Sequence, residues 1–371
     1  MNKKLISLLL SAALAVSMLT VPAFAAEGGE ADSALDETNE VVVTLGDTVT
    51  ASTVEDTDKA AADKTAADKT KTADSAPVAS TEKKQITYVA LGDSIVAGVG
   101  LADVKYAKDS TTLYSVDMSP NFKGYSPDCY VGKVAAMMGL DRDHAINLGL
   151  PALTAPDLAD MVRDGQMPKM NMESGCWYKY PEFQDYIRKA DVVSVQIGSN
   201  DAFVPCIVAL GNATNWKSEA LAASVLAGDL RASGSPAAAL IQGIKDMHLT
   251  RDERNATWNL LTSEMGKICD RIYPQTTAGL ISVVQEIRKL NPDCQILLMG
   301  YTDPVPFVPC WHNYFKKLNK FEKQLAETYD LTYVAIPKAK TDLDVHPTIS
   351  GHEYIAKKIV NSIELPEDSA Q

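Results

Sequence analysis

Short apolar runs alternate with amphipathic stretches over most of the chain from residue 85 onward. The first run, Ile86 to Leu91, is apolar on both faces of an extended strand and stops at Gly92. Similar runs cover 145–149, 191–198, 295–300 and 331–336. Strands that are apolar on both faces are typical of parallel sheets buried between helices. The pattern therefore predicts a parallel sheet at the centre of an α/β domain.

Helical periodicity fills the intervals between these runs. Between 280 and 290 the apolar residues fall at 280, 283, 284, 287 and 290, and the stripe ends just before Pro292. Ser350 to Glu353 has the form of a capping box, and an apolar stripe follows it as far as Ile363. Alternating strands and helices predict helices on both faces of the sheet, which is a three-layer α/β/α architecture.

The domain is expected to span residues 85–365, followed by a short tail over 366–371. Within it, the stretch from about 203 to 279 reads as helix and loop. It is too long for an ordinary connection between two strands. We therefore expect a mostly helical insertion near the ligand-binding edge of the sheet, where it could serve as a lid.

The N-terminal part of the chain has a different composition. Residues 1–25 combine a basic start, a short apolar core and an Ala-x-Ala end, which is typical of a secretory signal peptide cleaved near Ala25. Residues 26–84 contain a degenerate Ala-Asp-Lys-Thr repeat and no aromatic residue. Such a segment cannot bury enough apolar surface to fold, so we expect a disordered linker. Together these features predict a secreted protein.

The charge of the chain narrows the class of partner. The formal net charge is −13 and the isoelectric point is about 4.9. This acidity disfavours nucleic acid, which is bound largely through Lys and Arg, and it disfavours docking on anionic lipid. After the signal peptide, no segment is apolar for long enough to cross a bilayer. We expect a monomer with no stable membrane insertion.

Polar residues that could take part in catalysis follow several of the predicted strands. Ser94 comes directly after the first strand, where open α/β sheets bind their ligands. Gly149 and Asn200 follow two others, and His346 lies near the end of the chain. Acyl transfer requires a nucleophile, a base and donors for an oxyanion. Ser94 can be the nucleophile and His346 the base, with donors from the Ser94 and Gly149 N–H groups and the Asn200 amide. The alternative for Ser94 is a simple helix N-cap.

Four blocks in this order resemble the SGNH (GDSL-type) hydrolase family. They are Leu91-Gly92-Asp93-Ser94, Asn147-Leu148-Gly149, Ile197-Gly198-Ser199-Asn200-Asp201 and Asp344-Val345-His346-Pro347. The resemblance covers roughly 85–202 and 280–365. It implies a flavodoxin-like fold and a serine esterase without a metal or organic cofactor. The implied substrates are small-molecule or polymer-linked esters, such as acylated carbohydrates, cell-envelope polymers or lipids.

One departure from the family concerns the acid. In this family the acid usually stands three residues before the histidine, and here that position is Leu343. Asp344 is the nearest carboxylate and our assignment; Asp342 and a backbone carbonyl are the alternatives. Because Leu343 cannot act as the acid, an alternative interpretation is a non-catalytic carbohydrate- or envelope-binding domain that retains the fold. A metal-dependent hydrolase using the cluster from Asp342 to His352 is a further alternative, although the zinc-helix motif is absent.

Six cysteines allow disulfides in an exported chain. They are Cys129, Cys176, Cys206, Cys269, Cys294 and Cys310. The tetrapeptide Phe-Val-Pro-Cys occurs twice, ending at Cys206 and at Cys310. The repetition predicts a disulfide between these two, which would tie the start of the insertion to the loop after Gly300. Buried free thiols are the alternative.

Overall fold

The computed structural model describes residues 85–101, 103–104, 122–221, 233–304, 309–341 and 346–364. The predicted signal peptide, the linker, the C-terminal tail and Asp344 lie outside these described residues. None of the helices within them combines the length and the apolar character that crossing a bilayer requires.

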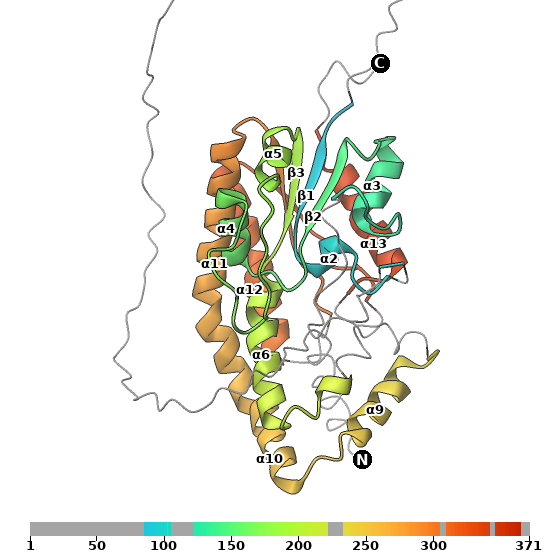
Figure 1. Ribbon diagram of the computed structural model, residues 1–371, viewed down its shortest axis with the longest axis vertical. Helices are drawn as coiled ribbons and strands as arrows, with labels where there is room; N and C mark the ends of the chain where they lie inside the picture. Colours follow the sequence, from blue (N-terminus) through green and yellow to red (C-terminus); the bar gives the residue numbers. More distant parts are fainter. Residues whose placement is uncertain are drawn as a thin grey trace, which may run out of the picture. The chain divides into compact units, whose positions relative to one another are not determined.

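Five parallel strands form the sheet in the described part of the chain. They are β1 (Tyr88–Gly92), β2 (Ala145–Gly149), β3 (Val192–Gln196), β4 (Gln295–Met299) and β5 (Thr332–Val334). Their order across the sheet is β2-β1-β3-β4-β5 (Figure 1). Every residue of β1, β2 and β3 is buried, including Asn147 in β2 and Ser194 and Gln196 in β3. The strand order reverses beside β1, which is where ligands bind in sheets of this kind.

The helices cover both faces of this sheet. Helices α3 (Tyr130–Met138) and α13 (Ile349–Val360) pack together on one face. Helices α4 (Ala155–Asp164), α11 (Met265–Leu290) and α12 (Pro309–Tyr329) cover the other (Figure 1). A short helix, α5 (Phe183–Arg188), precedes β3. The predicted three-layer α/β/α fold is confirmed.

The start of α13 differs from the predicted capping box. The N-cap is Thr348, whose hydroxyl accepts a hydrogen bond from the Gly351 backbone N–H at 3.1 Å. Thr348 has the extended backbone that an N-cap requires, whereas Ser350 already lies inside the helix. The sequence pattern was therefore read two residues too late.

The described residues of the predicted insertion are mostly helical, and its predicted limits fall inside helices. Helix α6 (Ser199–Ala213) runs through residue 203, and α11 runs through residue 279. Between them lie α9 (Pro236–Asp246), α10 (Arg251–Asn259) and a π-helical turn, η2 (Leu260–Glu264). The apolar stripe predicted from residue 280 is only the last part of α11, which has 26 residues. The insertion therefore continues directly into a helix of the core.

All six cysteines are free thiols, so the predicted Cys206–Cys310 disulfide is absent. The two tetrapeptides do bring their cysteines to one place, on α6 and α12. The thiol of Cys269 on α11 lies close enough to both of them for the neighbouring thiols to shift its pKa. The prediction was wrong because nothing in the sequence placed the third thiol between the other two.

Candidate active site

A sharp turn after β1 places Ser94 at the carboxyl edge of the sheet. Gly92 has a φ of +153°, and a Cβ there would lie 2.1 Å from the Gln196 carbonyl oxygen of the neighbouring strand. Only glycine fits such a close approach. The four-residue helix α2 (Ser94–Ala97) begins immediately afterwards, so Ser94 occupies its first position.

Ser94 and His346 meet in the structure although 252 residues separate them in the chain. The Ser94 Oγ lies 3.0 Å from His346 Nε2, which is hydrogen-bonding distance. His346 precedes α13 and is 1% exposed, while Ser94 is 6% exposed. A serine hydroxyl paired in this way with an imidazole nitrogen is the arrangement that nucleophilic catalysis requires.

Asp93 anchors a buried polar network beneath this pair. Its Oδ1 accepts a hydrogen bond from the Ile95 N–H at 3.0 Å and thereby caps α2. Its Oδ2 accepts from the Ser199 hydroxyl at 2.8 Å and from the Tyr301 hydroxyl at 3.0 Å. Burial raises the pKa of Asp93, while these three hydrogen bonds and the nearby His346 oppose the rise. The Asp93 carboxylate therefore stabilises the turn before Ser94 and lies within electrostatic reach of His346.

The predicted oxyanion donors Gly149 and Asn200 also reach this edge. A Cβ on Gly149 would lie 2.4 Å from the Ala97 backbone nitrogen, so glycine lets β2 approach α2. The Gly149 N–H donates to Asn147 Oδ1 at 2.9 Å. The Asn200 Nδ2 donates to the Leu153 carbonyl at 3.0 Å, and this amide has a second N–H. Both donors are thus held in place by neighbours, and the Gly149 N–H would have to exchange its partner to bind an oxyanion.

Asp201 lies in the first turn of α6. Its Oδ2 accepts a hydrogen bond at 2.9 Å from the Ala155 N–H, at the start of α4. Burial raises the pKa of Asp201 to about 7, and the hydrogen bond from Ala155 acts against the rise. The side chain therefore joins α4 to α6 behind Asn200.

Sequence reasoning missed three residues of this site. Tyr301 follows β4, Ser199 begins α6, and Asn147 lies within β2. Ser199 and Asn147 belong to the recognised sequence blocks, so their position next to Asn200 and Gly149 was a usable signal. No sequence signal pointed to Tyr301, because its hydrogen-bond partner Asp93 is 208 residues away in the chain. The site itself is reached by residues from β1, β2, β3, β4 and the segment before α13.

Among the described residues, no group of three or more His, Cys, Asp or Glu side chains is placed to hold a metal ion. His352, the residue considered for such a site, is fully buried in α13. Its Nδ1 accepts a hydrogen bond from the Tyr130 N–H at 3.2 Å, at the start of α3. His352 therefore joins α13 to the start of α3, which is a structural role.

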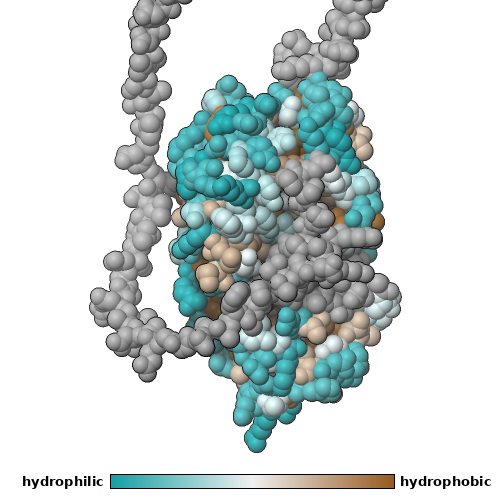
Figure 2. Space-filling view, viewed as in Figure 1, coloured by the Kyte–Doolittle hydropathy of each residue, from teal (hydrophilic) through white to brown (hydrophobic). Residues whose placement is uncertain are grey.

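A hairpin formed by residues 165–180 lies beside the site. The Tyr178 hydroxyl donates to the Pro151 carbonyl at 2.8 Å, two residues after Gly149. The hairpin also binds the start of α4, because the Asn171 amide donates to Asp157 at 3.0 Å. Figure 2 shows apolar surface, in pale brown, over this part of the molecule. Three large exposed side chains belong to the hairpin: Met170, Met172 and Trp177, with exposed fractions of 48%, 80% and 58%.

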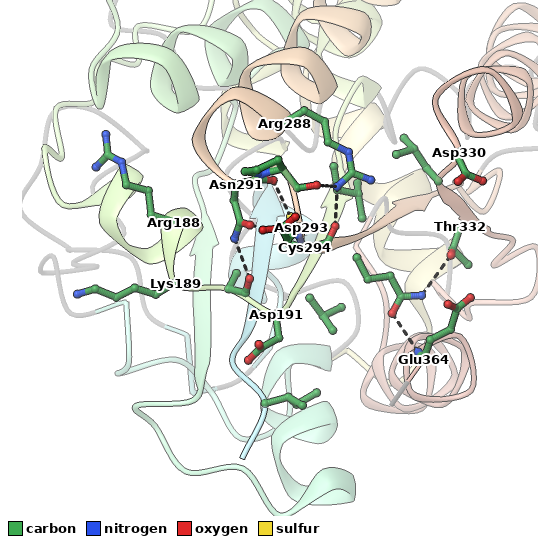
Figure 3. A pocket seen from close by; sticks show the side chains of 17 residues that line it. Arg188, Lys189, Asp191, Arg288, Asn291, Asp293, Cys294, Asp330, Thr332 and Glu364 are labelled. Carbon is green, nitrogen blue, oxygen red and sulfur yellow. Dashed lines mark hydrogen bonds between the residues drawn. The ribbon is translucent and has the colours of Figure 1, made fainter. Parts of the chain in front are cut away.

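A cavity of about 780 Å³ lies at the opposite, amino-terminal edge of the sheet (Figure 3). One of its charged groups, Arg288, donates to the Pro292 and Cys294 carbonyls at 3.1 and 2.6 Å. It is lined by the first residues of β3, β4 and β5. The cavity is therefore separated from Ser94 by the full length of the strands.

Comparisons with known proteins place the chain in a family. The model of the GDSL-like lipase/acylhydrolase family matches residues 90–354. No curated protein matches the chain.

Among solved structures, a lipase from a goat rumen metagenome is similar at 15% identity and a TM-score of 0.41, over 75% of this chain and 97% of that one. A carbohydrate acetylesterase from Sinorhizobium meliloti is similar at 14% identity and a TM-score of 0.40, over 75% and 97%. A mutant acetylxylan esterase from Geobacillus stearothermophilus is similar at 18% identity and a TM-score of 0.36, over 76% and 97%. With the family model matching most of its length, the chain belongs to the GDSL-like lipase/acylhydrolase family and is a carboxylic ester hydrolase.

Proposed function

We propose that this hydrolase is an exported serine esterase in which Ser94 forms an acyl-enzyme and His346 is the general base. The observation that carries the proposal is the 3.0 Å contact between Ser94 Oγ and His346 Nε2. The N-terminal signal-peptide pattern supports export.

In the first half of the reaction, Ser94 Oγ attacks the ester carbonyl carbon while His346 Nε2 takes the serine proton. The tetrahedral intermediate carries its negative charge on the former carbonyl oxygen. The Ser94 N–H, the Gly149 N–H and the Asn200 amide are the proposed donors to that oxygen. The intermediate then collapses, and the alcohol leaves with the proton from His346. Water, activated by the same imidazole, attacks the acyl-enzyme and releases the carboxylic acid.

The imidazolium that forms on His346 needs a nearby negative charge. The Asp93 carboxylate supplies one, because His346 and Asp93 interact electrostatically. We assign the hydrogen-bonding acid to Asp344, as the sequence predicts. Asp93 would then act through its charge and through its hold on the backbone next to Ser94, while Asp344 orients the ring.

For the substrate we propose an ester with an apolar acyl group. The hairpin supports this choice through its exposed apolar side chains, while two of its polar side chains, Asn171 and Ser174, hold the turn itself. Asn171 Oδ1 accepts from the Glu173 and Ser174 N–H groups at 3.1 and 3.2 Å, and the Ser174 hydroxyl lies 2.9 Å from the Cys176 sulfur. Beside exposed charged residues, the hairpin presents two thioethers and an indole outward, from Met170, Met172 and Trp177. Flexible methionine side chains adapt to alkyl chains of varied shape.

A fluorophosphonate probe tests the proposal directly, because it phosphonylates only an activated serine. We expect stoichiometric labelling of Ser94, and loss of labelling and of ester hydrolysis in Ser94→Ala. Ser350→Ala is the matched control, because Ser350 is an exposed serine in the first turn of α13, close in sequence to His346. The Ser350→Ala variant should be labelled by the probe and hydrolyse esters as the wild type does. A folded wild-type protein that is not labelled and cleaves no ester would instead be a binding module.

A further inference from the structure

Three cysteines from distant parts of the chain meet where α6, α11 and α12 pack together. Cys206 lies on α6, Cys269 on α11 and Cys310 at the start of α12. The thiol of Cys269 lies close enough to the thiols of Cys206 and Cys310 for them to affect one another's pKa, and Cys269 and Cys310 line the same cavity. The ester-cleaving mechanism uses none of them, so their grouping requires a separate explanation.

The three thiols differ in access to solvent. Cys206 is 0% exposed and Cys269 is 4% exposed, whereas Cys310 is partly exposed. Cys269 and Cys310 both line a surface cavity of about 130 Å³, and Cys206 does not. A small disulfide molecule arriving from solvent therefore reaches Cys310 first, with Cys269 directly behind it.

We propose that Cys310 and Cys269 form a thiol–disulfide exchange site that closes into a disulfide between α11 and α12. The Cys310 thiolate attacks one sulfur of a low-molecular-weight disulfide, which forms a mixed disulfide and releases one thiol. The Cys269 thiolate then attacks the Cys310 sulfur, forms the Cys269–Cys310 bond and releases the second thiol. The two protein thiols are oxidised by two electrons, the external disulfide is reduced, and the two protons end on the released thiols.

The surroundings of Cys269 and Cys310 determine the rate of this exchange. Contact with Cys269 and burial raise the pKa of the Cys310 thiol. The pKa of the Cys269 thiol is raised by contact with Cys206, by burial and by the nearby Asp270. Contact with Cys310 lowers it, but does not cancel the rise. Since the thiolate is the attacking species, exchange is slow at neutral pH. The thiols can therefore persist in reducing conditions and close only on prolonged exposure to an oxidant.

The same packing predicts a gain in stability. A bond between Cys269 and Cys310 would close a loop of roughly 40 residues, and such a bond restricts the unfolded chain. We expect oxidation to raise Tm by about 5–10 °C for a domain of this size. The cross-link would fasten α11, which carries the insertion, to α12 of the core.

The experiment uses the full chain, incubated with an excess of oxidised glutathione or with a reductant. In denaturant, the six thiols of the reduced protein should fall to four after oxidation. Peptide mapping after alkylation should identify the Cys269–Cys310 bond. Cys206→Ser should lose two thiols as the wild type does, whereas Cys310→Ser should lose none. Cys294→Ser, at the start of β4 on the far edge of the sheet, is the control and should behave as the wild type.

Three outcomes would overturn the proposal: six thiols that survive oxidation, a bond that includes Cys206, or glutathione that remains on Cys310 without closure. The serine variants are expected to fold, and their Tm under reducing conditions checks this. The rise in Tm should appear only in proteins that retain both Cys269 and Cys310. A rise that also occurs in Cys310→Ser would assign the stabilisation to another site.

Discussion

The hydroxyl of Tyr301 donates a hydrogen bond to Asp93 Oδ2 at 3.0 Å, although 208 residues separate the two in the chain. This bond links the loop after β4 to the residue that caps α2 and precedes Ser94. It also lowers the pKa of Asp93 against the effect of burial. The ionisation of the carboxylate beneath the Ser94–His346 pair therefore depends on a residue outside the family's sequence blocks.

Tyr301→Phe should move the acidic limb of the kcat profile to higher pH. Loss of the hydrogen bond raises the Asp93 pKa, so Asp93 becomes neutral at a higher pH and no longer stabilises the imidazolium of His346. A hydrogen bond to a charged group contributes about 1.5–3 kcal/mol, so a shift of roughly one pH unit or more is expected. Tyr125→Phe is the control, because Tyr125 donates to the Ala145 carbonyl at the other edge of the sheet. If the acidic limb of the kcat profile does not shift in Tyr301→Phe, then ionisation of Asp93 plays no part in catalysis.

Asn200→Ala should lower kcat by roughly 10²–10³ and leave KM nearly unchanged, because an oxyanion donor acts mainly in the transition state. Steady-state kinetics on a soluble ester measure both constants. The Tm of the variant must be compared as well, since the Asn200 amide also holds the Leu153 carbonyl. Asn313→Ala, an exposed position on α12, is the control. A raised KM with normal kcat would make Asn200 a substrate contact.

Asp344→Asn should reduce kcat strongly with little change in KM, and Asp342→Asn should be mild. The reason is that His346 requires an acceptor on Nδ1 so that Nε2 faces Ser94. Both variants lie in the same short segment, so each controls for the other. Near-normal turnover in both would leave a backbone carbonyl as the group that orients the ring, and our assignment of Asp344 would be wrong.

The acyl-chain proposal predicts a difference between long and short esters. Replacing Met170 and Met172 together by Ser should lower kcat/KM for long-chain p-nitrophenyl esters and leave the acetate ester unaffected, because only the long chain reaches the hairpin. Met137→Ser is the control, since Met137 is an exposed methionine on α3, on the other face of the sheet. Equal losses on acetate and long-chain esters would point to disturbed folding of the hairpin and would count against the proposal.

Much of the fold could be predicted from sequence because the relevant signals are local. The run at 145–149 coincides with β2, since it is mostly apolar and ends at a glycine. The order of the sequence blocks also predicted that Ser94, Gly149, Asn200 and His346 would share one edge. Contacts between elements could not be predicted in the same way. The position of Cys269 between two other cysteines depends on how α11 rotates against α6 and α12, and no local pattern specifies that rotation.

Glu322 on α12 provides a prediction about stability. Its side chain is 0% exposed, and neither carboxylate oxygen has a hydrogen-bond partner among the described residues. Burial holds its pKa well above the usual 4.5. The folded state therefore keeps a proton that the unfolded state releases. The stability contribution of this group is full below pH 4.5 and is lost as the pH rises toward the folded pKa.

Glu322→Met should consequently raise Tm at pH 8 and have a smaller effect near pH 4.5. An unsatisfied buried polar group typically costs about 1–3 kcal/mol, so a gain of several degrees is expected at the higher pH. Thermal unfolding of both proteins between pH 4.5 and 9 gives the difference. Glu327→Met, at an exposed position on the same helix, is the control. A difference independent of pH would show that the carboxyl group does not titrate differently on folding.

The continuity of α11 has a consequence for how this family member can diversify. The helix runs from Met265 to Leu290 without interruption, and its C-terminal half is buried against α4. The arm formed by α9 and α10 joins it through the π-helical turn at Leu260–Glu264. π-helical turns are local departures from regular helix geometry. An arm that joins the core helices only at the end of α6 and at this turn can change in length while the strands of the sheet keep their register.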